Sequence, residues 1–203
     1  MEKVDLKKEL KSLYNPSAKT VSMVDVPAFN FLMIDGHGNP NTAPEYAQAL
    51  EALYALAYTL KFKIKKGATG VDYAVMPLEG LWWVEDMDLF SVASKDDWLW
   101  TMMIAQPRYV TAELFAEALG EVEKKKGPVA LSKARFEAYH EGPSAQIMYF
   151  GPYADEGPTI AKIHAFIRES GCQLQGKHHE IYLGDPRKSA PEKLRTVIRQ
   201  PFK

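Results

Sequence analysis

The sequence predicts an α+β fold in which one strand–helix–strand–strand module occurs twice. Two observations support this duplication. The expected elements follow the same order in both halves of the 203 residues. Two short echoes also fall in matching places: Ile104-Ala105-Gln106-Pro107 resembles Ile198-Arg199-Gln200-Pro201, and Pro27 leads through a strand to Gly36 much as Pro143 leads to Gly151. We therefore expect a single domain over 1–203, with an N-terminal helical extension over 1–18, a first module over 19–127 and a second over 128–203.

The first module is expected to open with a strand and a long helix, after the extension. Leucines at helical spacing predict a short helix over 5–14, and residues 21–34 are β-like up to the glycine-rich turn that begins at Asp35. Thr42 and Glu45 have the spacing of a capping box, which would start the long helix.

Two strands and a second helix complete the first module. Residues 71–84 are expected to form one strand, bent at Pro77 or Gly80. A polar loop is expected over 85–97 and a strand over 98–106. Apolar residues at helical spacing predict the next helix over 111–126.

The second module repeats this order. Strand signals over 136–150 are interrupted at Glu141-Gly142-Pro143, and a helix is expected over 157–170. Strands over 178–183 and 195–200 close the chain. Corresponding strands of the two modules are therefore expected to occupy related positions.

The composition is that of an ordinary globular protein without marks of nucleic-acid or membrane binding. Apolar residues make up 46% and charged residues 25%, and the net charge of -1 provides no attraction to a phosphate backbone. The chain has no run of about 18 apolar residues, and its N-terminus lacks the apolar core of a signal peptide. The single cysteine, Cys172, excludes an internal disulfide. We expect a cytoplasmic protein with no nucleic-acid or membrane partner, either a monomer or a weak homodimer.

Glu180 stands in the middle of the strand expected over 178–183, where a carboxylate is unusual. A buried carboxylate is costly unless a partner or a proton neutralises it. The residues alone leave two interpretations open: Glu180 is an outward, solvated residue paired with Lys177 or Arg187, or it faces a ligand. Because residues two apart on a strand share a face, Tyr182 points the same way as Glu180.

The duplication suggests a counterpart for Glu180 in the first module. Glu79 lies in the middle of Met76-Pro77-Leu78-Glu79-Gly80-Leu81-Trp82-Trp83. Period-two spacing places Trp83 on the face of Glu79 and Trp82 on the other face, unless a bulge at Gly80 changes this. A carboxylate beside aromatic rings suits a cationic or planar aromatic ligand. The alternative for Glu79 is a residue at the rim of the site.

Three segments of the chain form a specific combination: MPLEGLWW, YFGPYADEGPT and GKHHEIYLGDPRKSAPEKLRTVIRQP. Together they resemble the GyrI-like small-molecule-binding family, over nearly the whole chain from about Val21. The resemblance implies two modules packed side by side into one antiparallel sheet, with helices on one face and a ligand cleft at the junction. The same domain senses drugs in BmrR-type transcription regulators, where a buried glutamate contacts lipophilic cations. Glu180 falls on that motif.

The resemblance also implies functions. Stand-alone members include a gyrase-inhibiting protein and a subgroup that hydrolyses cyclopropane-bearing DNA-alkylating natural products in an aromatic cage. This chain is similar to the stand-alone members, because only a short segment precedes its first strand. We expect it to bind lipophilic, planar aromatic or cationic small molecules and to hydrolyse an electrophilic, cyclopropane-type ligand as detoxification. The alternatives are a non-catalytic drug-binding or drug-sensing protein and an inhibitor that binds a topoisomerase.

The candidate site residues follow from these interpretations. The candidate catalytic residues are Glu180 and Tyr153. Glu180 would orient a water, protonate the developing oxyanion or stabilise a cation, and the Tyr153 hydroxyl would donate to a leaving group or hold a water. The candidate ligand contacts are Glu180, Tyr182, Trp83, Trp82, Glu79, Tyr153 and Tyr149. The aromatic candidates have structural alternatives: Tyr153 as a loop residue, and Tyr149 and one of the tryptophans as core.

Neither a metal nor another cofactor is expected. His178 and His179 are neighbours on a strand and therefore point to opposite faces, so they do not readily share an ion. The other histidines show no HxH or HExxH spacing.

Overall fold

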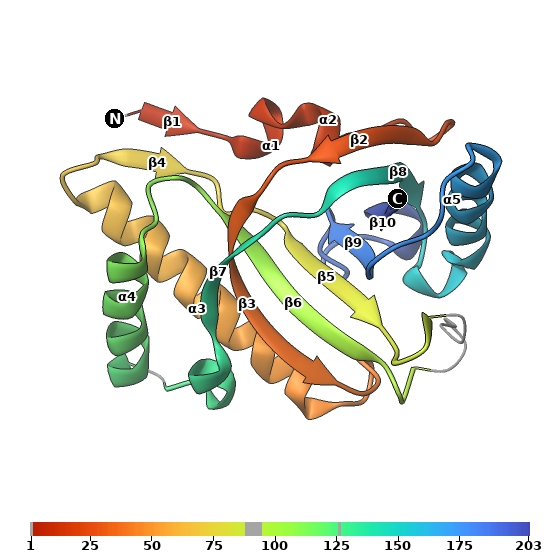
Figure 1. Ribbon diagram of the computed structural model, residues 1–203. Coiled ribbons are helices and arrows are strands. Elements are labelled where there is room, and N and C mark those ends of the chain that lie inside the picture. Colours follow the sequence, from red (N-terminus) through yellow and green to blue (C-terminus); the bar gives the residue numbers. More distant parts are fainter. Residues whose placement is uncertain (1, 88–94, 126) are drawn as a thin grey trace.

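The computed structural model describes residues 2–87, 95–125 and 127–203. Within these ranges, eight strands form one antiparallel sheet, and two form a small parallel sheet (Figure 1). The strands are β1 (Glu2–Val4), β2 (Ser22–Val26), β3 (Phe29–His37), β4 (Val71–Tyr73), β5 (Leu78–Trp83), β6 (Leu99–Gln106), β7 (Arg135–Tyr139), β8 (Gly142–Phe150), β9 (His178–Tyr182) and β10 (Arg195–Pro201). The predicted α+β class is confirmed.

Long helices follow the first strand of each module. The helices are α1 (Leu6–Glu9), α2 (Lys11–Tyr14), α3 (Pro44–Lys66), α4 (Ala112–Lys125) and α5 (Gly157–Glu169), with the short 3₁₀ helices η2 (Val129–Lys133), η3 (Tyr153–Asp155) and η4 (Pro191–Lys193). In Figure 1, α3 lies behind the first module's strands, α4 flanks α3, and α5 lies at the other end of the sheet.

The strand order of the large sheet shows the duplication. It is β2-β8-β10-β9-β5-β6-β3-β7, so the central six strands are two related triplets in reverse order, joined where β9 pairs with β5. In each triplet the first strand in sequence lies outside, the second lies at the junction and the third lies between them. The predicted strand–helix–strand–strand modules are confirmed.

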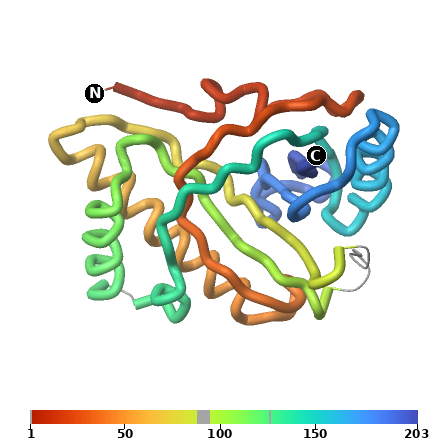
Figure 2. The backbone as a smooth tube through the Cα atoms, viewed as in Figure 1, coloured from red at the N-terminus to blue at the C-terminus, as the bar shows by residue number. Residues whose placement is uncertain are grey.

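The modules also exchange edge strands. The strand expected over 21–34 is divided after Val26 into β2 and β3, and that over 136–150 is divided after Tyr139 into β7 and β8. β2 pairs with β8 of the second module, and β7 pairs with β3 of the first. Figure 2 shows the β7–β8 segment crossing between the two halves. The sequence does not reveal this exchange, because pairing between distant strands leaves no local pattern.

The start of α3 differs from the prediction. Its N-cap is Ala43, and no side chain forms a capping hydrogen bond, so the expected Thr42–Glu45 capping box is wrong. The backbone nitrogens of Thr42 and Ala43 instead donate to the Asn39 carbonyl oxygen. The chain therefore enters the helix through a turn, and Pro44 occupies the first helical turn, where its missing N–H is not needed.

Two further expectations differ from the structure, and two others fall partly on residues that it does not describe. The strand expected over 71–84 is broken around Pro77: β4 pairs in parallel with β1, and β5 joins the large sheet. The helix expected over 5–14 is interrupted at Leu10. The loop expected over 85–97 and the end of the helix expected at residue 126 fall partly outside the described residues.

The two faces of the large sheet have different covers. Residues paired across strands share a face, and Trp82 pairs with Trp100 and with His178. Tyr46 of α3 stacks on Trp82, and α5 packs Ile163 into a cluster with Ile198. We call this side the α3–α5 face. The opposite side, where Tyr14 of α2 contacts Glu79, is the α2 face.

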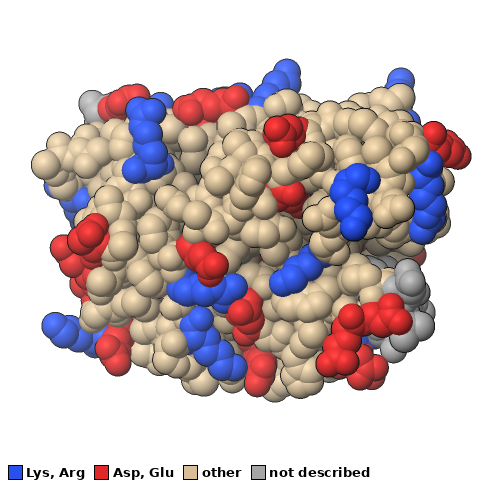
Figure 3. All heavy atoms as spheres, viewed as in Figure 1, with Lys and Arg blue, Asp and Glu red and all other residues tan. Residues whose placement is uncertain are grey.

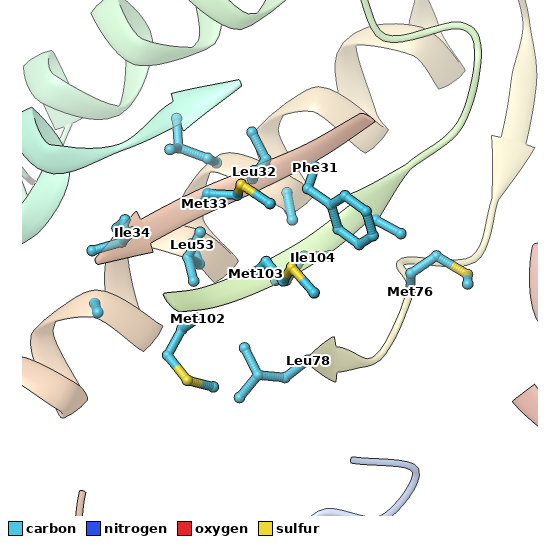
Figure 4. Close-up of a cluster of buried hydrophobic side chains, with 14 of the residues drawn as sticks. Phe31, Leu32, Met33, Ile34, Leu53, Met76, Leu78, Met102, Met103 and Ile104 are labelled. Carbon is cyan, nitrogen blue, oxygen red and sulfur yellow. The ribbon is translucent and has the colours of Figure 1, made fainter. Parts of the chain in front are cut away.

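An apolar core holds the first module's strands against α3. Figure 4 shows Leu32 and Ile34 of β3 and Ile104 of β6 in the same cluster as Leu53 of α3. These four side chains are at most 1% exposed. Close packing of this kind gives neighbouring side chains fixed positions, and it extends to Trp82 at the junction.

The surface carries charges of both signs. Lysine and arginine are interspersed with aspartate and glutamate over the side shown in Figure 3, in keeping with the net charge of -1. Among the described residues, no helix has the length and apolar character needed to cross a membrane.

Candidate functional site

Strand β9 presents successive residues to opposite faces of the sheet. His178, Glu180 and Tyr182 lie on the α3–α5 face, and His179 lies on the α2 face. The predicted divergence of the two histidines is confirmed. The Tyr182 hydroxyl donates to Glu180 Oε2 at 2.7 Å, so these two side chains also point the same way, as predicted.

Glu180 is buried at the centre of this arrangement and is 6% exposed. His178 Nε2 donates to Glu180 Oε1 at 3.0 Å, and Tyr182 donates to the other oxygen. Burial opposes the charge on Glu180, but the hydrogen bonds from His178 and Tyr182 outweigh it and lower the pKa of the carboxyl. Glu180 is therefore a buried carboxylate, which excludes the outward, solvated interpretation.

Trp82 is fixed beside Glu180 through Tyr182. The indole Nε1 of Trp82 donates to the Tyr182 hydroxyl oxygen at 2.9 Å. Gly80 pairs with Glu180, and a β-carbon at Gly80 would lie 2.7 Å from Trp82 Nε1, so the glycine makes room for the indole. Trp83 points to the α2 face, where Lys177 Nζ lies 3.3 Å from its ring centroid.

Rings from other elements complete an aromatic enclosure. The ring of Tyr46 stacks on that of Trp82 with centroids 6.1 Å apart, and the Trp98 centroid lies 5.1 Å from that of Trp82. Tyr153 meets Tyr182 edge-on with centroids 5.4 Å apart. Such surroundings have a low dielectric constant, which strengthens electrostatic interactions at Glu180.

The turn after β8 brings Tyr153 and a second carboxyl, Glu156, to this enclosure. Tyr149 donates from its hydroxyl to the Pro152 carbonyl oxygen at 3.0 Å and so holds the turn. Gly151 has a φ of 142°, and a β-carbon there would lie 2.5 Å from the Tyr149 hydroxyl oxygen. Only glycine adopts this conformation without strain while allowing that contact.

Glu156 is as deeply buried as Glu180. It is 2% exposed, and its Oε1 atom has no hydrogen-bond partner among the described residues. Burial and the negative charge of Glu180 raise the pKa of Glu156 far above its usual range. The two neighbouring carboxyls therefore differ in protonation at neutral pH, with Glu156 neutral and Glu180 ionised.

On the α2 face, Glu79 belongs to a closed ionic network. Its Oε1 accepts a hydrogen bond from Tyr14 at 2.8 Å, and its Oε2 lies 3.0 Å from His179 Nε2. His179 Nδ1 lies 2.8 Å from Glu141, which also accepts from Arg199 at 2.9 Å. Burial opposes the His179 charge, but Glu141 and Glu79 raise its pKa to about 9. For Glu141, His179 and Arg199 outweigh burial and lower the pKa to about 2.

Glu79 is not the counterpart of Glu180, and that prediction is wrong. Ile104 and Ile198 occupy matching places in the sequence echo. Ile104 pairs with Leu78, whereas Ile198 pairs with Glu180. Leu78 therefore takes the place of Glu180 in the first module. Because Glu79 and Glu180 lie on opposite faces, they do not line one cleft, and the same separation removes Trp83 from the surroundings of Glu180.

Glu156 and Glu180 line neither of two cavities found among the described residues. A small one of about 10 Å³ borders the ionic network. A larger one, of about 320 Å³, is lined by residues that include His164, Arg168 and Gln200. Burial lowers the pKa of His164 to about 4, with a further contribution from His178. In the described ranges, no group of three or more His, Cys, Asp or Glu side chains is arranged to hold a metal ion.

The sequence prediction missed Glu156, His178 and Tyr46 as members of the site. Period-two spacing was sufficient to place His178 on the face of Glu180. Glu156 stands directly before a helix, where an acid ordinarily serves the helix dipole and gives no sign of burial. Tyr46 has helical spacing and is indistinguishable in sequence from a core residue.

Comparisons with known proteins agree with this architecture. A profile described as the GyrI-like small molecule binding domain matches residues 19–203. An uncharacterized conserved protein from Listeria innocua is 40% identical, with a TM-score of 0.91 and coverage of 98% of this chain and 100% of that one. A hydrolase from Listeria innocua is also 40% identical, with a TM-score of 0.89 and full coverage of both chains.

A more distant solved structure is similar in fold alone. The C-terminal domain of EcmrR has a TM-score of 0.56 over 91% of this chain and 97% of that one, but it is only 10% identical and shares the fold alone. No curated protein sequence matches the chain.

Proposed function

The chain belongs to the GyrI-like small-molecule-binding family, and on that basis we propose that it binds a planar, lipophilic molecule against Glu180 and hydrolyses an electrophilic group of that ligand. One observation carries the proposal: an ionised carboxylate is buried within an enclosure of aromatic rings. Burying such a charge costs stability. Titratable groups in such surroundings concentrate at functional sites.

The aromatic rings would provide most of the binding surface. Trp82 donates a hydrogen bond to Tyr182, and Tyr182 donates one to Glu180. Tyr153 is only half-buried and stands in the short helix η3. A planar ligand that separates Tyr153 from Tyr182 would stack on one ring, meet the edge of the other and lie next to the carboxylate.

The Glu180 carboxylate suits the hydrolysis of a strained ring, such as a cyclopropane conjugated with a carbonyl group. Attack by water places positive charge on the attacking oxygen and negative charge on the carbonyl oxygen. Glu180 would accept a hydrogen bond from the water and stabilise the positive charge. Burial, with the neighbouring carboxyls of Glu156 and Glu180, raises the pKa of Tyr153 to about 12, so its hydroxyl stays a donor at neutral pH.

The comparison with known proteins supports chemistry at this site. The Listeria innocua protein that is 40% identical over the full length of both chains is described as a hydrolase. We propose cyclopropane-bearing DNA alkylators as the ligand class, which is the class that the family resemblance implies. Their hydrolysis in the cytoplasm would destroy the reactive group before it reaches DNA.

Product formation tests this proposal. In isotopically labelled water, wild-type protein is expected to convert a cyclopropane-bearing alkylator to a ring-opened product that carries the labelled oxygen. Glu180→Gln preserves the shape of the side chain and removes its charge, and it should slow the reaction roughly 10²- to 10⁴-fold. Glu137→Gln makes the same change at an exposed position of β7 and serves as the control. Wild-type turnover in Glu180→Gln rejects the site, and the absence of any product rejects hydrolysis.

A second function rests on the lowered pKa of Glu180. An anion enclosed by rings also suits a lipophilic cation that is bound without chemistry. This function predicts that a panel of cationic dyes quenches tryptophan fluorescence without product formation. Glu180→Gln should then weaken the binding of cationic dyes more than that of neutral dyes of the same shape.

A further inference from the structure

Two buried polar atoms near Glu180 lack hydrogen-bond partners among the described residues. They are Oε1 of Glu156 and Oγ1 of Thr196, and both residues are at most 2% exposed. Thr196 pairs with Tyr182 on one side and with Tyr149 on the other, so it lies on the α3–α5 face. Buried polar atoms are nearly always paired, so each exception needs an explanation, such as an ordered water or a catalytic role.

Glu156 and Glu180 approach each other from different elements of the fold. Glu180 comes from β9, whereas Glu156 comes from the start of α5 through the turn that Tyr149 supports. Glu156 lies close enough to the Glu180 carboxylate and the Thr196 hydroxyl for both groups to influence its pKa. Two carboxyls in one dry site do not both ionise, because their like charges repel. Environments that separate the protonation of two carboxyls in this way assign one as the acid and the other as the anion.

We infer that Glu156 is the proton donor of the hydrolysis proposed above and that Thr196 positions its carboxyl group. The inference rests on the proposed function and adds the acid that the reaction requires. Tyr182 does not suit this role, because its hydroxyl already donates to Glu180 and accepts from Trp82. The Oε1 atom of Glu156, in contrast, is not engaged by another described residue.

The step balances with these two carboxyls and one water molecule. The water oxygen bonds to a cyclopropane carbon, the ring C–C bond breaks, and its electron pair moves through the conjugated system to the carbonyl oxygen. Glu156 gives its proton to that oxygen, and the attacking water gives one proton to Glu180. The ligand thereby gains one water. Transfer of a proton from Glu180 to the adjacent Glu156 restores the starting state.

Infrared spectroscopy tests the protonation state of Glu156 without a substrate, through the difference between the wild-type and variant spectra. At neutral pH, the wild-type protein is expected to show the C=O stretch of a protonated carboxyl in dry surroundings. Glu156→Gln should remove this band, whereas Asp155→Asn, which changes an exposed carboxylate one residue away, should retain it. A wild-type protein without the band overturns the inference, whether or not it hydrolyses a ligand.

Kinetics with a cyclopropane-bearing alkylator tests the role in the reaction. Glu156→Gln should lower kcat roughly 10²- to 10⁴-fold and change KM little, while Asp155→Asn should keep the wild-type kcat. Thr196→Val, which keeps the side-chain shape, should lower kcat and move the alkaline limb of its pH profile upward, because the hydroxyl lowers the Glu156 pKa. Thr196→Ser should restore both.

Two results contradict the proton-donor role. One is wild-type kcat in Glu156→Gln. The other is an unchanged pH profile in Thr196→Val. If the infrared band is present but the wild-type protein yields no ring-opened product, the proposed hydrolysis and the donor role fall together. In that case the infrared band supports only the protonated state of Glu156.

Discussion

His178 and His179 are neighbours on β9, but they contact different buried carboxylates on opposite faces of the sheet. On the α2 face, His179 and Arg199 meet Glu79 and Glu141, so two cationic side chains face two carboxylates. On the α3–α5 face, two carboxyls lie together, one of them protonated, and two polar atoms lack partners among the described residues.

The two faces hold two kinds of buried charged group: a network that stabilises the fold, and a pair of carboxyls that we assign to the proposed function. A closed network of matched charges satisfies its members and links segments far apart in sequence, as Arg199 does by also donating to the Leu13 carbonyl oxygen. An arrangement that keeps a neutral acid, Glu156, beside a buried carboxylate costs stability, because burial and the neighbouring charge oppose ionisation of the acid in the folded protein. Its presence fits the ligand binding and hydrolysis proposed above. Substitutions in the ionic network on the α2 face should therefore lower the stability of the fold, whereas substitution of Glu156 on the α3–α5 face should raise it.

The largest expected effect on stability is at Arg199. Arg199→Met leaves Glu141 buried with one cationic partner fewer and removes the donors to Gln146 and Leu13. The free energy of unfolding should fall by about 3–5 kcal/mol, the cost of breaking a buried ion pair. Urea denaturation measures it. Arg195→Met, at an exposed position of the same strand, should change stability by less than about 0.5 kcal/mol. Equal losses in the two variants would contradict a structural role for the network.

The next effect is the pH dependence of the ionic network. The pKa of His179 is raised from 6.5 to about 9, so its contribution is complete below pH 6.5 and is lost as pH rises toward 9. Stability should fall by about 1–3 kcal/mol over this range. Glu141, with its pKa lowered from 4.5 to about 2, acts at the acid end, and its contribution is lost as pH falls through that range.

His179→Gln should remove the alkaline part of this dependence. The comparison is best made in a Glu156→Gln background, because Glu156 titrates with the same sign. Parallel stability curves with and without His179 would contradict the raised pKa.

Glu156→Gln should raise the stability of the protein, in contrast to substitutions in the ionic network. Its pKa is raised in the folded protein, so above the usual value of 4.5 the unfolded chain ionises while the folded one does not. This destabilises the fold increasingly as pH rises. Glu156→Gln should therefore stabilise the protein by about 1–2 kcal/mol near about pH 8 and have little effect near about pH 4. Thermal unfolding at the two pH values measures this, and a destabilised variant at the higher pH would contradict the comparison.

The smallest effect concerns the two adjacent tryptophans. Trp82→Phe removes the hydrogen bond to Tyr182, and binding of a planar dye should weaken by about 1 kcal/mol. Trp83→Phe, on the α2 face, should leave the dye affinity unchanged. Fluorescence titration with an emissive dye measures both. Equal weakening would show that the ligand reaches the α2 face.

Local pattern was sufficient for much of the fold and part of the site. Period two along β9 correctly placed Tyr182 beside Glu180 and separated the two histidines. Helical spacing identified α3, α4 and α5 within a few residues of their ends. These features depend on neighbours in sequence, which is why sequence reasoning reached them.

Features that depend on pairing between distant segments were out of reach. The mistaken match of Glu79 with Glu180 arose because a short echo does not give strand register, and a one-residue shift moves a side chain to the other face. The exchange of β2 and β7 between the modules is non-local in the same way. Glu156 reaches the site only through the Tyr149-supported turn, which no spacing rule describes.

The central claim is that the chemistry occurs on the α3–α5 face and not on the α2 face. The most direct test compares kcat/KM for a cyclopropane-bearing alkylator in Glu180→Gln and Glu79→Gln, at a temperature where circular dichroism shows both variants folded. We expect Glu180→Gln to lose roughly 10²- to 10⁴-fold and Glu79→Gln to stay within about threefold of wild type. An equal loss in both variants, or a loss only in Glu79→Gln, would contradict the assignment.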